Sequence, residues 1–185
     1  MSFRRPNGPI WRGCRSRAVP GAALCVAALT LACASAASSE PPYALIGQSA
    51  PDFALHAVAA GNVRLSEHRG QVVVLSFWGS HCGTCRTQLT ALDRSFTTYR
   101  SAGLAVYGVD VDDDPAGALD FAHSASLSFA LLLDPAKAVA RSYQVDNLPM
   151  TVLIDRNGTV RYVLREFNRA NDALYLQQLH LLLDE

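Results

Sequence analysis

The feature that constrains this chain most is an unbroken apolar run that leads into two cysteines spaced three positions apart. Residues 71–78 read QVVVLSFW, and this β-branched and aromatic run is typical of a strand covered on both faces of a sheet. Cys82-Gly83-Thr84-Cys85 follows, and apolar residues then recur with helical spacing as far as Tyr99. The sequence therefore predicts a buried strand, a turn that carries both cysteines, and a helix.

The segments on either side of this unit predict an α/β domain with a mixed central sheet and helices on both faces. An apolar strand after the helix implies a parallel crossover, and tight turns imply hairpins near both ends. Three consecutive aspartates, residues 112–114, are expected to cap a helix and face solvent rather than bind metal. The expected elements are a hairpin (51–55 and 63–65), a strand (71–78), a helix closed by Gly103, a strand (104–109), a helix (about 112–126), a strand (130–133), a helix (135–143), a hairpin (150–155 and 159–164), and a closing helix with Leu176, Leu179 and Leu183 on one stripe.

The start of the chain has the order of a secretory leader. Five arginines and no acidic residue precede an apolar stretch, residues 18–34, and Ala34-Ser35-Ala36 fits a cleavage site. A retained membrane anchor is an open alternative, although Pro20-Gly21 interrupts the apolar stretch. Export would place the protein in the periplasm or elsewhere outside the cytoplasm.

A second interpretation of the leader involves Cys33. Residues 29–33, LTLAC, resemble the lipobox of bacterial lipoproteins but have Thr30 where leucine is usual, so Cys33 is a candidate for lipidation. We divide the chain into a signal peptide or lipoprotein leader (1–36), a linker (37–44) and one domain (45–185). A lipid or an uncleaved leader would tether that domain to a membrane.

The charge balance argues against nucleic acid as a partner. The whole chain has 16 basic and 16 acidic side chains, and removal of the five leader arginines leaves 11 basic against 16 acidic ones. The expected domain thus carries a net charge of about −5 with neutral histidines, which is the wrong sign for binding phosphates.

The two cysteines of the domain are expected to act chemically. Cys14, Cys25 and Cys33 fall in the leader, and a bridge between Cys82 and Cys85 closes almost no loop, so it would restrict the unfolded chain very little. At a helix N-terminus, backbone N–H groups and the helix dipole favour a thiolate on the first cysteine. We expect Cys82 to be the nucleophile and Cys85 to resolve the mixed disulfide. No second cysteine pair follows, so zinc is disfavoured and no cofactor is expected.

From about Ala50 to the C-terminus the chain resembles the TlpA/ResA branch of the thioredoxin-like proteins. The resemblance implies a thioredoxin-like fold with an N-terminal β-hairpin and an extra helix inserted after the second core strand. It also implies a monomeric thiol:disulfide oxidoreductase that reduces extracytoplasmic protein substrates, in cytochrome c maturation or copper-site assembly, and receives electrons from a membrane donor. The motifs that carry it are APDFAL (50–55), LS (65–66), RG (69–70), FWGSHCGTC (77–85), LP (148–149), LID (153–155) and NG (157–158).

The same resemblance assigns roles around the cysteine pair. Pro149 matches a cis-proline that faces the pair and leaves the backbone of Leu148 free to bind a substrate strand. Trp78 flanks the active-site turn, which is the turn that carries Cys82 and Cys85, although a place in the core is an equally good interpretation. Gly83 and Thr84, between the cysteines, influence the redox potential.

Three departures from the family pattern matter. His81 stands where tryptophan is common, Thr84 where proline is usual, and Gln88 and Ser76 where relatives have a buried carboxylate that accepts the proton of the resolving thiol. Neither Gln88 nor Ser76 can accept a proton at neutral pH. Deprotonation of Cys85 would then need water, His81 or another acid such as Glu67.

Other functions use the same atoms. A thiol oxidase or isomerase differs from a reductase only in redox potential, which the sequence does not reveal. A Cu(I)-binding module would use Cys82, Cys85 and His81 as ligands. A binding scaffold with an idle disulfide is the third alternative.

Overall fold

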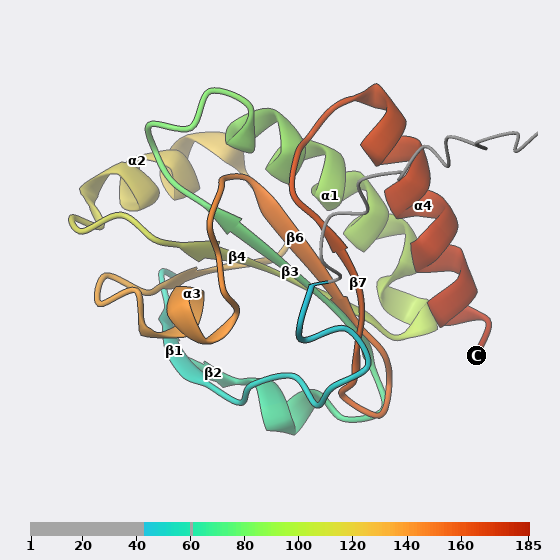
Figure 1. Cartoon of the computed structure of the whole chain (residues 1–185). Coiled ribbons are helices and arrows are strands. Elements are labelled where there is room, and N and C mark those ends of the chain that lie inside the picture. The colour runs from blue at the N-terminus through green and yellow to red at the C-terminus, as the bar shows by residue number, and fades with distance from the viewer. Residues whose placement is uncertain (1–42, 60) are drawn as a thin grey trace, which may run out of the picture. The chain divides into compact units, whose positions relative to one another are not determined.

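The computed structural model describes residues 43–59 and 61–185, which form a mixed seven-stranded sheet flanked by helices (Figure 1). The order of the strands in the sheet is β2-β1-β5-β4-β3-β6-β7. The strands are β1 (Ala54–Ala57), β2 (Asn62–Arg64), β3 (Val72–Trp78), β4 (Leu104–Asp110), β5 (Ala130–Leu133), β6 (Met150–Ile154) and β7 (Val160–Leu164). The helices are α1 (Cys85–Tyr99), α2 (Ala116–Ala125), α3 (Ala138–Ser142) and α4 (Arg169–Leu183).

Strands β3 and β4 form the centre of the sheet. They pair in parallel from Val72 opposite Leu104 to Trp78 opposite Asp110, and every residue of both strands is buried. On its other edge β3 pairs antiparallel with β6. The strand that leads to the cysteines is thus held on both sides, and this arrangement confirms the buried strand and the mixed sheet predicted from the sequence.

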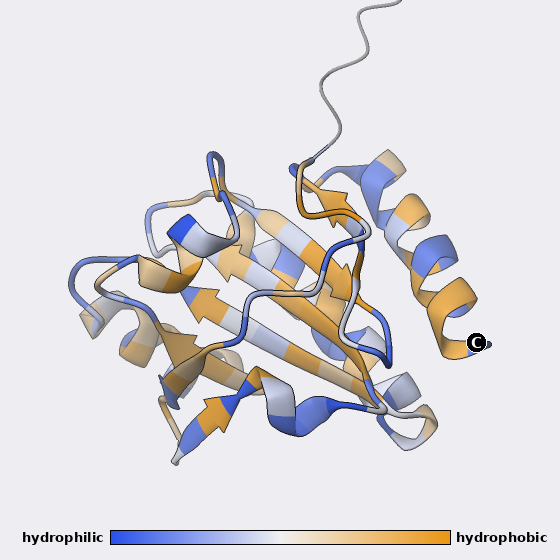
Figure 2. Cartoon of the chain, turned by 60° about the horizontal axis from the view of Figure 1, so that its bottom comes forward, coloured by the Kyte–Doolittle hydropathy of each residue, from blue (hydrophilic) through white to orange (hydrophobic). Residues whose placement is uncertain are grey.

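Helices cover both faces of the sheet. Helices α1, α2 and α4 contribute Leu89, Phe121 and Leu179 to one core, whereas α3 and the N-terminal segment contribute Val139 and Phe53 to the other. Figure 2 shows that hydrophobic residues are concentrated on the strands between these layers. The layers, the N-terminal hairpin and the inserted helix α2 agree with a thioredoxin-like fold.

The structure differs from the sequence prediction mainly at element ends. Helix α3 begins at Ala138 rather than near residue 135, because the carboxylate of Asp134 accepts the N–H groups of Ala138 and Ala140 at 2.9 and 2.8 Å and so defines its start. In α4 the fully buried leucines are Leu179 and Leu182, and the predicted Leu176 and Leu183 are partly buried and pack against the same core.

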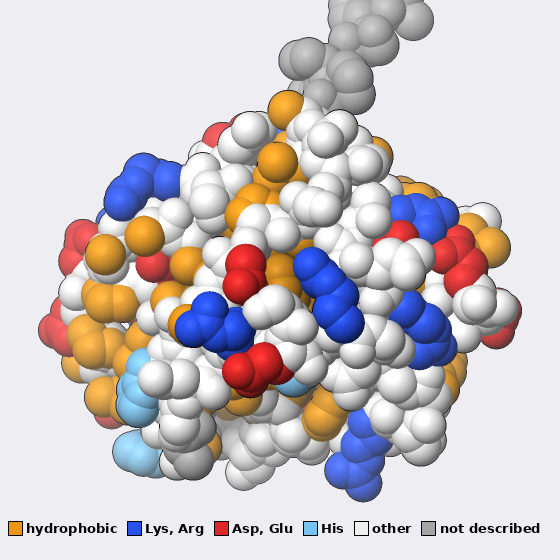
Figure 3. All heavy atoms as spheres, turned by 90° about the horizontal axis from the view of Figure 1, so that it is seen from below, with side chains coloured by type: hydrophobic (Ala, Val, Ile, Leu, Met, Phe, Trp, Pro, Cys, Tyr) orange, Lys and Arg blue, Asp and Glu red, His pale blue; other side chains and the backbone are white. Residues whose placement is uncertain are grey.

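The domain already packs at Tyr43, which falls in the expected linker. Its ring is buried, and its hydroxyl donates a hydrogen bond to the backbone carbonyl of Tyr143. The expected leader (1–36) and the lipidation candidate Cys33 lie outside the described residues. Among the helices of residues 43–59 and 61–185, none is long and apolar enough to cross a membrane. Figure 3 shows acidic and basic side chains interspersed on one face of the domain.

Candidate active site

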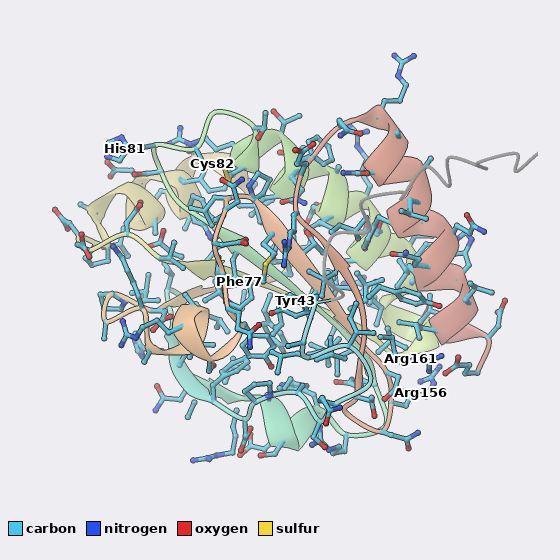
Figure 4. All side chains as sticks on the ribbon, viewed as in Figure 1. Tyr43, Phe77, His81, Cys82, Arg156 and Arg161 are labelled. Atoms are coloured by element: carbon cyan, nitrogen blue, oxygen red, sulfur yellow. A yellow bond between two sulfur atoms is a disulfide. The ribbon has the colours of Figure 1, made fainter. Side chains whose placement is uncertain are left out.

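The two cysteines form a disulfide at the junction between β3 and α1. Cys82 and Cys85 are bonded through their sulfurs, with Cα atoms 5.4 Å apart. The backbone turns tightly here, because the N–H of Cys82 donates to the carbonyl of Gly79 and that of Cys85 to the carbonyl of Cys82. Figure 4 shows Cys82 at the end of the sheet near the start of α1, far from Arg156 and Arg161.

The two sulfurs have different access to solvent. Cys85 is the first residue of α1 and is fully buried in the core against α2, whereas Cys82 is partly exposed. The hydroxyl of Thr84 lies 4.0 Å from the Cys82 sulfur. This difference in access is what stepwise exchange requires, since one sulfur can meet an outside disulfide and the other can act only from within.

The turn before Cys82 is held by Asp112, which follows β4. The N–H of Ser80 donates to Asp112 Oδ2 at 2.7 Å, and a Cβ atom on Gly79 would lie only 2.8 Å from Asp112 Oδ1. On the other side Ser80 packs so closely against Gly117 of α2 that any side chain at residue 117 would overlap it. The active-site turn is therefore clamped between the end of β4 and the start of α2.

This clamp corrects the interpretation of the three aspartates as helix caps. Only Asp114 caps α2, by accepting the N–H of Ala116 at 3.0 Å. Asp113 pairs with Lys137 at 2.8 Å, and Asp112 binds the active-site turn instead. The sequence does not reveal this difference, because three neighbouring aspartates have the same local pattern.

The Leu148–Pro149 peptide bond is cis and lies beside the turn. Met150, the next residue, pairs with Phe77 at the end of β3, and the Leu148 side chain would lie 3.5 Å from a Cβ atom on Gly79. An open groove of about 680 Å³ begins here. It is lined by Val111, Asp112, Lys137, Ala140, Arg141, Val145, Asp146, Asn147 and Leu148.

The remaining residues expected at the site separate into buried and exposed groups. Trp78 is fully buried and its ring centroid lies 5.1 Å from that of Phe121, so it belongs to the core and shapes the turn from inside. His81, Gly83 and Thr84 are exposed, and Figure 4 shows His81 at the outer edge of the turn.

Gln88 and Ser76, at the positions where the resemblance implies a buried carboxylate, form a neutral hydrogen-bonded chain. Ser76 Oγ donates to Gln88 Oε1 at 3.0 Å, and Gln88 Nε2 donates to Thr151 Oγ1 at 2.7 Å. All three side chains are buried. Glu67 precedes β3 and so lies at the opposite end of that strand from Cys82, which leaves it no direct role in proton transfer.

A buried acid that sequence reasoning missed lies at the end of β4. Asp110 is 1% exposed, and burial, followed by the negative charge of Asp112, raises its pKa to about 7. Its position at the end of an apolar strand made it look like a strand terminator. One signal could have revealed Asp110. In the parallel pair of β3 and β4 it lies opposite Trp78, and charged residues are rare at such buried positions.

The copper ligand set proposed from the sequence is not assembled in this disulfide-bonded state. Among the described residues no three His, Cys, Asp or Glu side chains come together as metal ligands. Cu(I) binding would first need both sulfurs to be freed by reduction.

Comparisons with known proteins agree with this geometry. Residues 46–163 match the AhpC/TSA family. The thiol-disulfide oxidoreductase ResA of Geobacillus kaustophilus is 32% identical over 126 residues, which cover 68% of this chain and 72% of that protein.

Two solved structures extend the similarity to the fold. One, from Chlorobium tepidum and named for the thiol:disulfide interchange protein DsbE, has a TM-score of 0.72 and 35% identity over 75% of this chain and 97% of that one. Another, from Bacteroides thetaiotaomicron and named for a protein disulfide isomerase, has a TM-score of 0.70 and 32% identity over 76% and 91% of the two chains. The chain therefore belongs to the AhpC/TSA family of thioredoxin-like proteins and, with its relatives named ResA, is a thiol:disulfide oxidoreductase.

Proposed function

We propose that the protein reduces disulfides of extracytoplasmic proteins, with Cys82 as nucleophile and Cys85 as resolving thiol. The observation that carries the proposal is the pairing of a partly exposed Cys82 with a fully buried Cys85 at the start of α1. The location outside the cytoplasm rests on the leader-like first 36 residues, and the reducing direction on the resemblance to the TlpA/ResA branch.

The exchange proceeds in two thiolate attacks. The Cys82 thiolate attacks one sulfur of the substrate disulfide, forms a mixed disulfide and releases the other substrate sulfur as a thiolate. Cys85 then loses its proton and attacks the Cys82 sulfur, which releases the second substrate thiolate and leaves the Cys82–Cys85 disulfide. Two electrons thus pass to the substrate, and a reductant, proposed to be a membrane donor, must restore the dithiol.

The groove beside Leu148 and Pro149 fits an extended protein segment. It is open, and Leu148 lies at its edge and next to the Cys82 turn, so a strand bound along it would bring its own disulfide to the exposed sulfur. Lys137, Arg141 and Asp146 line the groove, so the bound segment would meet charges of both signs.

The reduction potential tests the direction of the reaction. Equilibration of the purified protein with glutathione buffers should give a value near that of thioredoxin, about −270 mV, and the reduced protein should reduce insulin. A value near about −120 mV, typical of a dedicated thiol oxidase, would overturn the reductant assignment. Failure of Cys82 to exchange with glutathione at all would overturn the enzyme assignment.

A further inference from the structure

The end of β4 places two carboxyl groups directly behind the turn that carries Cys82. Asp110 is the last residue of β4, and Asp112 follows two positions later, close enough for its charge to act on the Asp110 carboxyl. Asp110 pairs in register with Trp78, and Asp112 accepts the N–H of Ser80. The two acids thus lie against the last residue of β3 and the first residues of the active-site turn.

Two buried polar atoms at this place have no hydrogen-bond partner. Trp78 Nε1 and Asp110 Oδ1 are two of the four such side-chain atoms in the part of the chain that the structure describes. Trp78 Nε1 lies over Gly108, 3.3 Å from where a Cβ atom would be. Because Asp110 Oδ1 is buried without a partner and an ionised carboxylate costs far more to bury than a neutral acid, this environment favours a protonated Asp110.

The charge on Asp112 acts in the same direction. Asp112 is less buried than Asp110, and its carboxylate accepts the Ser80 N–H. A second negative charge close to this carboxylate would be repelled. Burial and this repulsion together raise the pKa of Asp110 to about 7. Asp110 therefore keeps its proton to well above the pH range that is usual for an aspartate.

We propose that Asp110 and Asp112 form a carboxyl pair that holds one proton and positions the Cys82 turn through the hydrogen bond between Asp112 and Ser80. Loss of the retained proton places a second negative charge behind the turn, which disfavours the Cys82 thiolate. Asp110 and Asp112 are positioning residues, since among the described residues no hydrogen bond links either of them to a cysteine sulfur. The inference rests on the proposed function, in which Cys82 is the nucleophile.

The other charged groups nearby are already engaged or point elsewhere. The Asp134 carboxylate accepts two N–H groups of α3, and Lys137 pairs with Asp113. Arg141 on α3 lines the groove and donates to the carbonyl of Ala136. Arg86 on α1 stacks over Phe121, and His81 is exposed. Among the described residues no cation forms an ion pair with Asp110 or Asp112.

The first test observes the proton directly. Carbon-13 NMR of aspartate carboxyls in the oxidised protein should show one carboxyl that titrates near neutral pH, and Asp110→Asn should remove this signal. Asp113→Asn is the matched control, because it neutralises an exposed neighbour in the same cluster and should leave the titration unchanged. The proposal is wrong if no aspartate titrates above pH 6 or if Asp113→Asn removes the signal.

The second test follows the thiol. In the reduced protein, the rate of Cys82 alkylation plotted against pH should show two inflections between pH 5 and 9, but only one in Asp110→Asn. At pH 8 the variant should react roughly threefold faster than wild type, because a nearby negative charge is gone. Asp112→Asn, which keeps an oxygen for Ser80, should move the carbon-13 titration of Asp110 to lower pH. Identical alkylation profiles in all variants would overturn the inference and leave the enzyme assignment intact. If Cys82 reacts in no variant, the proposed function fails, whereas the NMR titration still decides on the carboxyl pair.

Discussion

Ser76 and Gln88 are hydrogen-bonded to each other in the core, 3.0 Å apart, at the two positions where the resemblance to the TlpA/ResA branch implies a proton acceptor for the resolving thiol. Gln88 in turn donates to Thr151 on β6. These hydrogen bonds form a neutral link that ties α1 to β3 and β6. The consequence is that Cys85 has no adjacent base from this set of residues.

We expect Gln88→Glu to accelerate resolution by Cys85 and to make it depend on pH. A carboxylate at residue 88 can accept the Cys85 proton, whereas the amide cannot. Because a charge would be buried there, the free energy of unfolding should fall by about 1–3 kcal/mol. Stopped-flow reduction of a model disulfide measures the rate. Thr87→Glu, which adds the same charge at an exposed neighbour on α1, is the control, and equal rates for wild type and Gln88→Glu at every pH would contradict the idea.

The two cysteines should differ in reactivity. In the reduced protein we expect Cys82 to be alkylated roughly tenfold faster than Cys85 at pH 7, because it is more exposed and its thiolate is favoured at the helix N-terminus. Cys85→Ser should accumulate a mixed disulfide with substrate, and Cys82→Ser should not. Mass spectrometry of the alkylated and trapped species measures both, and faster labelling of Cys85 would reverse the assigned roles.

The stability of the oxidised protein should fall as the pH rises from 4 to 8. The pKa of Asp110 is raised from 3.8 in the unfolded chain to about 7 in the folded one, so the folded state binds more protons in this range. The contribution of Asp110 to the free energy of unfolding is fully present below pH 3.8 and is lost as the pH rises through about 7. A loss of a few kcal/mol is expected from this shift. Urea unfolding at pH 5 and pH 8 measures it, and Asp110→Asn should make the two values more alike; an unchanged difference in that variant would contradict the assignment.

The leader-like pattern of residues 1–36 predicts where the mature chain begins. We expect cleavage after Ala36, which leaves Ala37 as the first residue. The intact mass of the protein isolated from the membrane and soluble fractions of an expressing bacterium measures this. A lipid-modified Cys33 at the N-terminus would instead establish the lipoprotein alternative, and Cys33→Ser would then release the protein from the membrane.

Much of the fold could be read from the sequence, because its signals are local. The apolar run of β3 and the Asn157-Gly158 turn between β6 and β7 each define their element by themselves, and Gly158 has the positive φ of 80° that such a turn needs. The helix ends were less predictable. The start of α3 depends on Asp134 accepting N–H groups from residues four and six positions later, a contact that propensity alone does not reveal.

At the site, the sequence by itself determined the chemistry: two cysteines three positions apart at the start of a helix can form a disulfide and exchange it. Only the tertiary structure decided which charges surround them. Asp112 is 32 positions from Ser80 in the chain, and Gln88 is 63 from Thr151, so these contacts exist only because β4 and β6 lie on either side of β3. Local patterns specify which backbone conformations are accessible, but burial and pairing between distant segments set the protonation of a group such as Asp110.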